Sequence, residues 1–333
     1  MNTIKNVLIT GGAGYVGAVL VPKMLDAGYK VTVLDWFLFQ PEVFASYADN
    51  RNLVQIKGDI RDEQAVRRAL AGQDAVIHLA CISNDPSFEM DPELGKSINY
   101  DASLQLFHLA KEKGIRRFIY ASSSSVYGVK EEDAVTEDLS LEPLTDYSKF
   151  KALCEPELLA MADETFVPLV LRPATVCGYS PRLRLDLTVN ILTCHAIEKG
   201  KITVFGGDQT RPNIHIEDMT DLYIKTLEYT DEQIAGKTFN AGYDNFTVYE
   251  IAKMVQEVVG KDVEIIRQDS DDKRSYRVDS SKIKRELGFE AKRTVKDAIQ
   301  DIAQAFAAGK VPNALTDPRY YNIKMMQEEK QPV

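Results

Sequence analysis

A tyrosine and a lysine one helical turn apart are the residues of this chain best suited to moving a proton. Tyr147 and Lys151 fall in a stretch whose apolar spacing predicts a helix over 146–163, so both side chains lie on one helix face. A tyrosine hydroxyl ionises near pH 10. It exchanges protons near neutral pH only when a nearby positive charge, such as the lysine ammonium group, lowers its pKa.

A run of serines supplies a hydroxyl for the same chemistry. Ser122 to Ser125 end an apolar stretch that predicts a strand over 116–122, and Val126-Tyr127-Gly128 follow. At the mouth of a sheet, Ser123 would hydrogen-bond a substrate hydroxyl and fix its position. A tyrosine and lysine on an amphipathic helix are by themselves commonly a solvated edge, so the interpretation depends on the elements around them.

Those elements alternate between short apolar runs and longer amphipathic stretches through the first 175 residues. This pattern is typical of repeated βαβ units and predicts an α/β fold with a Rossmann-type doubly wound parallel sheet. The predicted strands cover 5–10, 30–35, 52–56, 74–80, 116–122 and 167–172, and the predicted helices cover 15–27, 62–71, 95–113 and 146–163.

The alternation weakens after about residue 178, which predicts a second and smaller α/β lobe that binds the substrate. We therefore expect a dinucleotide-binding domain over 1–178 that includes the Tyr/Lys helix. The smaller lobe would cover mainly 179–315, with some segments returning to the first domain. A loosely ordered tail would follow over 316–333, which is rich in Gln, Glu and Lys.

A glycine-rich turn follows the first predicted strand. Gly11, Gly14 and Gly17 form a GxxGxxG series directly before a helical pattern. Residues without Cβ atoms allow a tight turn whose N–H groups approach a pyrophosphate at the positive end of the helix. A glycine triplet alone is weak evidence, but its position between a strand and a helix predicts a dinucleotide site.

Two acidic residues refine this site. Asp35 ends the next predicted strand, where a carboxylate accepts hydrogen bonds from an adenosine ribose diol and repels a 2′-phosphate. The cofactor is therefore predicted to be NAD rather than NADP, and the positive charge of its nicotinamide would add to that of Lys151. Asp59 and Ile60 end the third strand and are expected at the adenine, although an Asp after a strand is often only turn chemistry.

Composition excludes several other classes of function. Fifty acidic and forty basic side chains give a net charge of −10, which disfavours nucleic-acid binding. No apolar run reaches the roughly 20 residues of a membrane span, and no signal-peptide pattern precedes the first strand, so a cytoplasmic location and no membrane partner are expected. Four dispersed cysteines and four dispersed histidines disfavour a disulfide framework or a metal site.

Together these motifs resemble the extended short-chain dehydrogenase/reductase superfamily, specifically its nucleotide-sugar epimerase/dehydratase branch, over nearly the whole chain. The matching stretches are GGAGYVG, Asp35, GDI at 58–60, HLA at 78–80, Asn99, SSSSVYG, YSKFK, LRPATVCG at 171–178, TRPNIH at 210–215 and the segment from Arg274 to Gly288. The resemblance implies that Ser123, Tyr147 and Lys151 are catalytic, with Tyr147 as the base. It implies NAD contacts from Gly11, Gly14, Tyr15, Val16, Gly17, Asp35, Asp59, Ile60, Leu79, Ala80, Asn99, Tyr147, Lys151 and Pro173.

The resemblance also implies a nucleotide-diphosphate sugar as substrate. Planar arginine side chains suit bidentate pairing with its phosphates. The residues expected at this substrate are Ser83, Asn84, Ser123, Ser124, Tyr147, Thr175, Arg184, Asn190, Arg211 and Arg274. For Asn84 an Asx turn before Pro86 is an equal alternative. A homodimer through a four-helix contact that includes the Tyr/Lys helix is expected from the resemblance alone.

Two departures from the family's sequence pattern limit which of the family's reactions this chain is expected to catalyse. Dehydratases of the family carry Thr-Asp-Glu where this chain has Ser123, Ser124 and Ser125, and elimination of water needs the missing carboxylates. Dehydration is therefore disfavoured, and so is 3,5-epimerisation, because the cysteine that such members carry near Ser125 is absent. Many 4-epimerases have an asparagine at the place of Thr175, which weakens that assignment.

Three hypotheses remain open from the sequence. The first is an NAD-dependent epimerase that acts through a transient 4-keto sugar. The second is a net 4-dehydrogenase or reductase on the same substrate class, which SPRLRLDLTVN at 180–190 and DKRSY around Arg274 also resemble. The third is a catalytically silent NAD-binding sensor, which the intact Ser/Tyr/Lys set disfavours.

Overall fold

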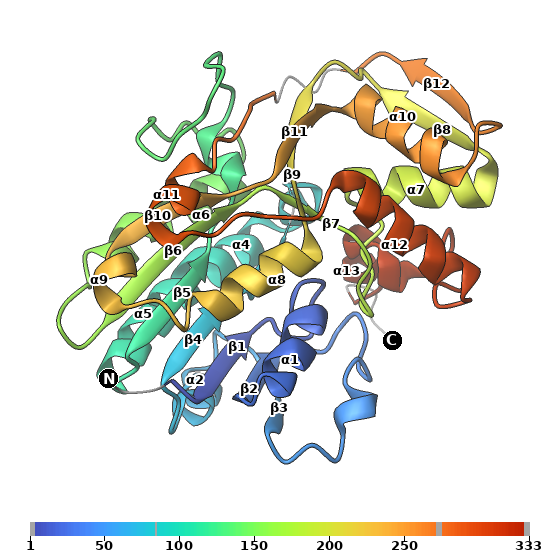
Figure 1. The fold of residues 1–333 in the computed structure, drawn as a ribbon. Helices are drawn as coiled ribbons and strands as arrows, with labels where there is room; N and C mark the ends of the chain where they lie inside the picture. The colour runs from blue at the N-terminus through green and yellow to red at the C-terminus, as the bar shows by residue number, and fades with distance from the viewer. Residues whose placement is uncertain (1–3, 84, 271–274, 330–333) are drawn as a thin grey trace. The chain divides into compact units, whose positions relative to one another are not determined.

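The computed structural model, drawn in Figure 1, describes residues 4–83, 85–270 and 275–329. The contacts within the chain divide it into two compact units. Unit 1 consists of Met1–Val126, Pro143–Arg172 and Thr220–Phe239, and unit 2 of Tyr127–Glu142, Pro173–Met219 and Asn240–Val333. The middle segment of unit 1 ends at Arg172, and Thr220–Phe239 is its last segment. The inclusion of 127–142 in unit 2 was not anticipated.

Unit 1 is built on a parallel sheet with helices packed against it. Seven strands lie in the order β10-β6-β5-β4-β1-β2-β3, and the pairings that join β6 through β3 are all parallel. The strands are β1 (Asn6–Thr10), β2 (Lys30–Asp35), β3 (Leu53–Lys57), β4 (Ala75–His78), β5 (Arg117–Ala121), β6 (Val167–Pro173) and β10 (Lys237–Ala241). Because the order runs outward from β1 in both directions, the predicted Rossmann-type doubly wound fold is confirmed.

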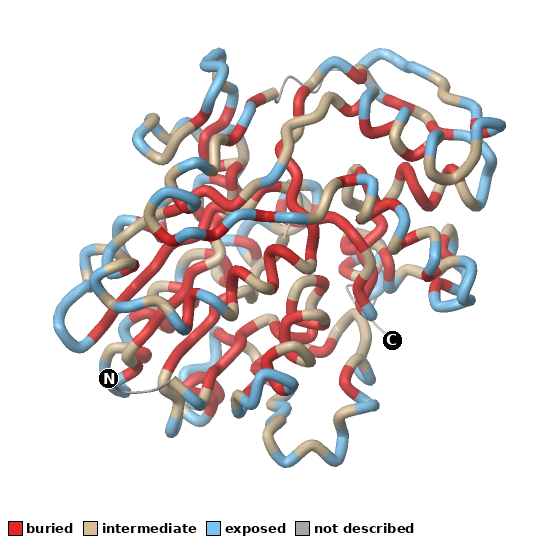
Figure 2. Tube along the Cα trace, in the orientation of Figure 1, coloured by how far each residue is buried: buried red, intermediate tan, exposed pale blue. Residues whose placement is uncertain are grey.

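The apolar runs of the central strands reflect burial on both faces of this sheet. Every residue of β4 is buried, and β1 and β5 are buried along almost their whole length, as Figure 2 shows. The edge strand β3 instead has only half-buried and exposed positions. Six of the seven strands were predicted to within two residues at either end. The seventh, β10, has the mixed sequence KTFNA and carries no strong strand signal.

The helices of unit 1 are α1 (Gly17–Asp26), α2 (Glu63–Leu70), α3 (Asp85–Glu89), α4 (Pro92–Lys96), α5 (Ala102–Glu112), α6 (Asp146–Leu159) and α9 (Asp231–Ile234), and α8 (Ile216–Lys225) crosses from unit 2 into unit 1. Helices α1, α2, α5 and α6 fall within the four predicted helical stretches, and the other helices of the unit were not predicted. The helix predicted over 95–113 is interrupted by a π-helical segment, η2 (Ser97–Asp101). The Ser103 hydroxyl donates to the carbonyls of Asn99 and Ile98 at the widened turn, at 3.0 and 3.4 Å.

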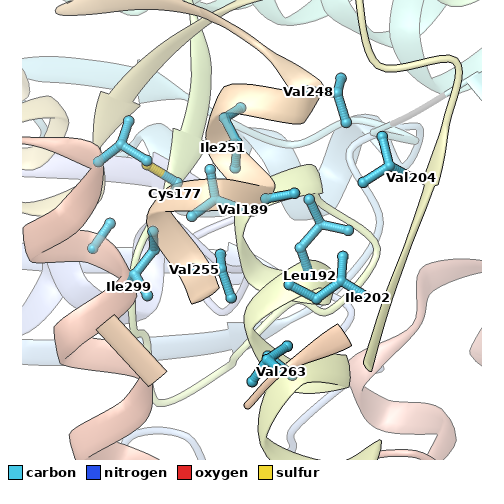
Figure 3. Packing of buried hydrophobic residues seen from close by; sticks show 14 residues of the cluster. Cys177, Val189, Leu192, Ile202, Val204, Val248, Ile251, Val255, Val263 and Ile299 are labelled. Carbon is cyan, nitrogen blue, oxygen red and sulfur yellow. The ribbon is translucent and has the colours of Figure 1, made fainter. Parts of the chain in front are cut away.

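Unit 2 packs helices and two small sheets around its own core. Strands β11 (Asp244–Thr247), β9 (Thr210–His215) and β7 (Thr175–Cys177) form one sheet, and β12 (Glu264–Gln268) and β8 (Lys201–Phe205) form the other. Helices α7 (Thr188–Lys199), α10 (Val248–Val259) and α12 (Val295–Ala307) pack against one another, and α11 (Ser281–Leu287) follows β12 in the chain. Figure 3 shows the core cluster to which α7, α10 and α12 contribute, including Val189, Ile251 and Val255.

The end of the described chain is ordered, which corrects the expected loose tail. A 3₁₀ turn, η4 (Pro318–Tyr320), leads into helix α13 (Asn322–Glu329). The Leu185 N–H donates to the Tyr320 carbonyl at 2.8 Å, and the buried Arg182 guanidinium donates to the Asn322 side chain. These contacts within unit 2 outweigh the polar composition from which disorder was predicted. No helix in the described part of the chain has the length and apolar character of a membrane span.

Candidate active site

The glycine turn after β1 is packed too tightly to accept side chains at two of its glycines. Gly11 has a φ of 71°, and its N–H donates to the Leu34 carbonyl at 2.9 Å. A Cβ on Gly11 would lie 2.5 Å from the Ala80 backbone nitrogen at the end of β4, and a Cβ on Gly17 would collide with the Gly12 backbone. The turn therefore brings Gly11 against Ala80 and Gly17 against Gly12.

The amino terminus of α1 directly follows this turn. Val16 is the N-cap of α1, and among the described residues no side chain makes the capping hydrogen bond and no acidic residue lies in the first turn. The first N–H groups of a helix carry partial positive charge and attract phosphate. A Cβ on Gly14 would meet only the Gly11 carbonyl, at 3.1 Å, among the described atoms within 4 Å. The turn therefore fits a dinucleotide pyrophosphate.

Asp35 is held against the glycine turn. It ends β2, and its carboxylate accepts the Ala13 N–H at 2.9 Å through one oxygen and the Phe37 N–H at 2.7 Å through the other. Phe37 has a φ of 55°, an uncommon conformation for a non-glycine residue. This geometry fixes a negative charge beside the expected phosphate site. It suits a ribose diol and disfavours a 2′-phosphate.

Asp59, predicted at the adenine, forms an ion pair with Arg61. Its carboxylate accepts two hydrogen bonds from the Arg61 guanidinium at 2.6 and 3.0 Å, and the guanidinium lies 5.8 Å from the centre of the Trp36 ring. Burial alone would raise the pKa of Asp59, but the hydrogen bonds and charge of Arg61 hold it below its usual value. Ile60, next to it, is buried. An adenine contact through Ile60 stays a prediction.

The loop after β4 is fixed by a buried amide. The Asn99 side chain accepts the Ile82 N–H at 2.8 Å and donates to the Ile82 carbonyl at 3.0 Å. Asn99, predicted to bind the cofactor, thus holds the backbone that follows Leu79 and Ala80. Ser83 comes next and is half-buried. Asn84, predicted at the substrate, lies outside the described residues.

Lys151 is anchored at the carboxyl end of β5. Its Nζ donates to the Ala121 carbonyl at 2.7 Å and lies 4.9 Å from the centre of the Tyr120 ring, and the residue is 2% exposed. A carbonyl oxygen and the face of an aromatic ring both stabilise a buried ammonium group. The predicted lysine is therefore placed directly before the serine run, where a fixed positive charge acts on nearby acidic protons.

The helix that carries Lys151 begins with a capping box. Thr145 accepts the Ser148 N–H, Ser148 accepts the Thr145 N–H, and α6 starts at Asp146. Tyr147 is the second residue of the helix and is half-buried, one turn before Lys151. Because the capping box sets where α6 begins, it also fixes Tyr147 on the first turn.

The serine turn holds Ser123 in place. The Ser125 N–H donates to Ser123 Oγ at 3.1 Å, and the hydroxyls of Ser123 and Ser125 are 2.8 Å apart. Ser123 is half-buried and Ser124, predicted at the substrate, is buried. The turn presents the Ser123 oxygen in a defined position, as a residue that orients a substrate hydroxyl requires.

One group of residues beneath this site was missed by the sequence analysis. Glu155, one turn after Lys151, forms a salt bridge with Arg172 of β6, and Ser122 donates to the same carboxylate. All three residues are buried. The spacing of Glu155 from Lys151 along α6 was the available signal, but the partner on β6 becomes evident only in the fold.

Unit 2 carries the remaining predicted substrate residues. Asn190 is fully buried on α7, where its side chain accepts the Gly178 N–H at 3.1 Å and donates to the Arg184 carbonyl at 2.9 Å. Arg184 is itself mostly buried and donates to Asp186 at 2.7 Å. Asn190 therefore shapes the loop that presents Arg184.

Three further predicted positions lie on strands. Thr175 opens β7 and pairs in register with Asn213 of β9, and the half-buried Arg211 lies two residues earlier on β9. The Arg211 guanidinium donates to the Thr210 carbonyl at 3.2 Å. Pro173 is the last residue of β6. Arg274, predicted to bind the diphosphate, lies outside the described residues.

Comparison with known proteins agrees with this geometry. Residues 7–242 match the NAD dependent epimerase/dehydratase family. UDP-glucose 4-epimerase of Bacillus subtilis (strain 168) is 28% identical over 327 residues, which cover 89% of this chain and 95% of that protein. dTDP-glucose 4,6-dehydratase of Streptomyces griseus is 30% identical over 298 residues, which cover 85% and 88%.

The similarity also holds for a solved three-dimensional structure. The UDP-glucuronic acid 4-epimerase from Bacillus cereus, in complex with UDP-glucuronic acid and NAD, superimposes with a TM-score of 0.81. It is 28% identical in sequence, and the match covers 90% of this chain and 99% of that one. The fold of that epimerase is therefore shared by almost the whole of this chain.

Proposed function

Since the chain belongs to the NAD-dependent epimerase/dehydratase family and is an NAD-dependent enzyme of the short-chain dehydrogenase/reductase type, we propose that it epimerises a nucleotide-diphosphate sugar at carbon 4. The observation that carries this proposal is the anchoring of Lys151. Its ammonium group is fixed at the carboxyl end of β5, one residue before the serine run and one helical turn from Tyr147.

In the proposed reaction Tyr147 removes the proton from the sugar 4-hydroxyl. The fixed charge of Lys151 favours the ionised form of the tyrosine. Ser123 donates a hydrogen bond to the same sugar oxygen and orients it. NAD, when bound, supplies the acceptor and later the donor of a hydride at sugar carbon 4. The proton on Tyr147 returns to the oxygen when the transient ketone is reduced from its other face.

Substrate recognition is proposed for residues of unit 2. Arg184 and Arg211 carry the planar, permanently charged groups that suit bidentate pairing with a diphosphate. Arg184 is supported for this role by its fixed position on the loop that Asn190 holds. Relatives named for UDP-glucose and UDP-glucuronic acid support a UDP-sugar as the first substrate class to test.

A net 4-dehydrogenase or reductase is the second candidate, because it shares the first step and differs only in releasing the ketone. Dehydration is disfavoured even though one relative is a dehydratase. Ser124 and Ser125 stand where family dehydratases carry two carboxylates, and the Ser125 hydroxyl is directed at Ser123. No acid and base pair for removing water is available at these two positions.

The two candidates differ in their products. Purified protein would be incubated with UDP-, GDP-, CDP- and dTDP-sugars while absorbance at 340 nm is recorded and the sugars are separated. The proposal predicts an epimer without net NADH, from at least one of these substrates. Accumulating NADH together with a ketone would favour the dehydrogenase, and turnover of none of them would contradict both.

We further propose a cytoplasmic homodimer. A reducing compartment is supported by the four cysteines, which are all thiols. The dimer is supported by Leu153 on α6, an apolar side chain that is 50% exposed in the single chain. A second copy that covers α5 and α6 would bury it.

A further inference from the structure

The buried ion pair between Glu155 and Arg172 lies directly behind the proposed catalytic residues and has no part in the proposed reaction. Their side chains are 3% and 7% exposed. The Arg172 Nε lies 3.1 Å from both carboxylate oxygens of Glu155, and its Nη2 lies 2.5 Å from one of them. Ser122 donates a further hydrogen bond to this carboxylate. Burying two charges costs free energy that only close, well-satisfied pairing offsets.

The pair joins α6 to two strands at the level of the reacting groups. Lys151 and Glu155 lie one turn apart on α6, and they bond to consecutive residues at the end of β5, namely the Ala121 carbonyl and the Ser122 hydroxyl. Arg172 adds β6 to the same contact. Ser123 follows immediately. These two attachments therefore contribute to the rotation and height of α6 relative to the serine turn, and with them to the position of Tyr147.

Two charged residues flank Tyr147 on its own helix, Asp146 and Lys149, and they pair with each other at 3.0 Å at an exposed position. Three buried titratable groups near Lys151 are neutral. Burial lowers the pKa of His78 on β4 to about 3, and it raises the pKa of Cys154 on α6 to about 11 and that of Tyr120 on β5 well above 10. Asp85 of α3 accepts the Thr145 hydroxyl at the start of α6. Among these groups, the charges nearest the serine turn belong to Lys151, Glu155 and Arg172, and the last two cancel.

We propose that Glu155 and Arg172 are positioning residues which fix α6 on the sheet and, by cancelling each other, leave Lys151 as the net charge that acts on Tyr147. This inference rests on the proposed role of Tyr147 as the base. It predicts that the two residues affect catalysis in two separable ways, through geometry and through charge.

The pH dependence of kcat/KM separates the two effects, because its acidic limb reports ionisation of the base in the free enzyme. Glu155→Gln removes the negative charge, while Arg172 stays protonated at every accessible pH. Glu155 lies eight residues from Tyr147, about 12 Å along the helix. The positive charge of Arg172, no longer compensated, favours ionised Tyr147 and should lower its pKa. The acidic limb of the kcat/KM profile should therefore move to lower pH, by a few tenths to about one pH unit. Glu155→Asp keeps the charge and shortens the side chain, so kcat should fall at least tenfold with the limb unmoved.

Asp231→Asn is the matched control. Asp231 pairs with Arg117 at the opposite end of β5, far along the strand from the serine turn. This variant should lose stability but keep the wild-type pH profile. The inference is overturned if Glu155→Gln has the wild-type acidic limb, or if Asp231→Asn moves it equally. Should Glu155→Gln not fold, Arg172→Lys replaces it: a wild-type kcat in Arg172→Lys and Glu155→Asp would refute the positioning role.

Failure of the proposed function gives a different result. If Tyr147→Phe retains turnover, the base has been assigned wrongly, whatever the Glu155 variants do. If Tyr147→Phe is inactive with NAD still bound, while Glu155→Gln and Glu155→Asp match the wild type in both kcat and pH profile, only the inference fails.

Discussion

His78 lies at the end of β4 and contributes to the fold rather than to the reaction. Its Nδ1 lies 2.6 Å from the Thr10 hydroxyl and its Nε2 lies 3.0 Å from the Ser103 hydroxyl, and its ring stacks on Tyr120. Burial, reinforced by the charge of Lys151, lowers the pKa of His78 to about 3. The imidazole is therefore neutral in the folded protein at any pH near neutrality.

This depressed pKa predicts a pH-dependent stability. Above pH 6.5 both folded and unfolded chains carry neutral His78, and its contribution is fully present. Between pH 6.5 and about 3 only the unfolded chain takes up the proton. The free energy of unfolding therefore decreases as the pH is lowered, by at most about 1.4 kcal/mol per pH unit. Urea unfolding at pH 7 and pH 5 should show a smaller loss in His78→Gln than in wild type. His108→Gln, at an exposed position, is the control. Parallel losses in wild type and His78→Gln would contradict the assignment.

Individual site residues could be predicted from the sequence only where residues nearby in the chain carry the signal. Tyr147 and Lys151 were predicted because helical spacing places them on one face, and Gly11 because a strand and a helix flank it. The Glu155 and Arg172 pair was not found, because the two residues come from different elements whose contact depends on strand order. The engagement of Asp59 by Arg61 was also missed, since an acidic residue after a strand has many alternative partners.

At the scale of elements, the turn between β1 and α1 shows how backbone requirements shape the proposed cofactor site. Position 11 requires a glycine for two reasons, namely its positive φ and the close approach of the Ala80 backbone. The resulting tight turn brings the amino terminus of α1 next to Asp35, whose carboxylate accepts the Ala13 N–H. The glycine pattern predicted this turn. The close approach of β4 could not be read from it.

The two requirements at Gly11 can be separated by experiment. Gly72 has a φ of 72°, almost the 71° of Gly11, but a Cβ there would meet no described atom within 4 Å. Gly72→Ala should therefore cost about 1 kcal/mol from backbone strain alone. Gly11→Ala adds a collision with the backbone of Leu79 and Ala80, directly after β4, and should cost about 2 to 5 kcal/mol. It should also weaken NAD binding at least tenfold.

Urea unfolding and titration with NAD would measure these effects. Trp36 is the only tryptophan of the chain and adjoins Asp35, so its fluorescence is a convenient signal. Equal losses of stability in the two alanine variants, with NAD affinity unchanged in Gly11→Ala, would contradict the assigned role of the turn.

Other elements show where local patterns fail. The apolar spacing over 95–113 predicted one helix, yet a π-helical segment interrupts it where Asn99 turns its side chain to the Ile82 backbone. The end of the chain looked polar enough for disorder, but α13 is held by Asn322 and Tyr320. In both cases contacts to distant residues decide the local structure.

At the scale of the whole molecule, neither compact unit is one continuous stretch of the chain. Residues 127–142 belong to unit 2 although the segments before and after them belong to unit 1, and residues 220–239 belong to unit 1 although unit 2 flanks them on both sides. The alternation of strands and helices predicted the sheet and its doubly wound order, because each βαβ unit is a local pattern. These excursions have no such pattern and could not be predicted beyond the expectation that some segments return.

The proposed homodimer makes a prediction at this scale. Light scattering should give twice the 37.3 kDa mass of the chain, and Leu153→Glu should shift the protein toward the monomer because a buried charge at an interface is costly. Val54→Glu is the matched control, since Val54 on the edge strand β3 is 51% exposed against 50% for Leu153. A monomeric wild type, or a Leu153→Glu variant that stays dimeric, would contradict the proposed interface.

The most direct test of the enzyme assignment is Tyr147→Phe, which removes one hydroxyl and keeps the ring. Tyr100→Phe, in the same unit, is the control for the substitution itself. With a nucleotide sugar that the wild type epimerises, Tyr147→Phe should bind NAD with wild-type affinity and form no epimer, a loss of at least about 1000-fold in kcat. Turnover near the wild-type rate in this variant would contradict the proposal that the Tyr147 hydroxyl exchanges the proton of the reaction.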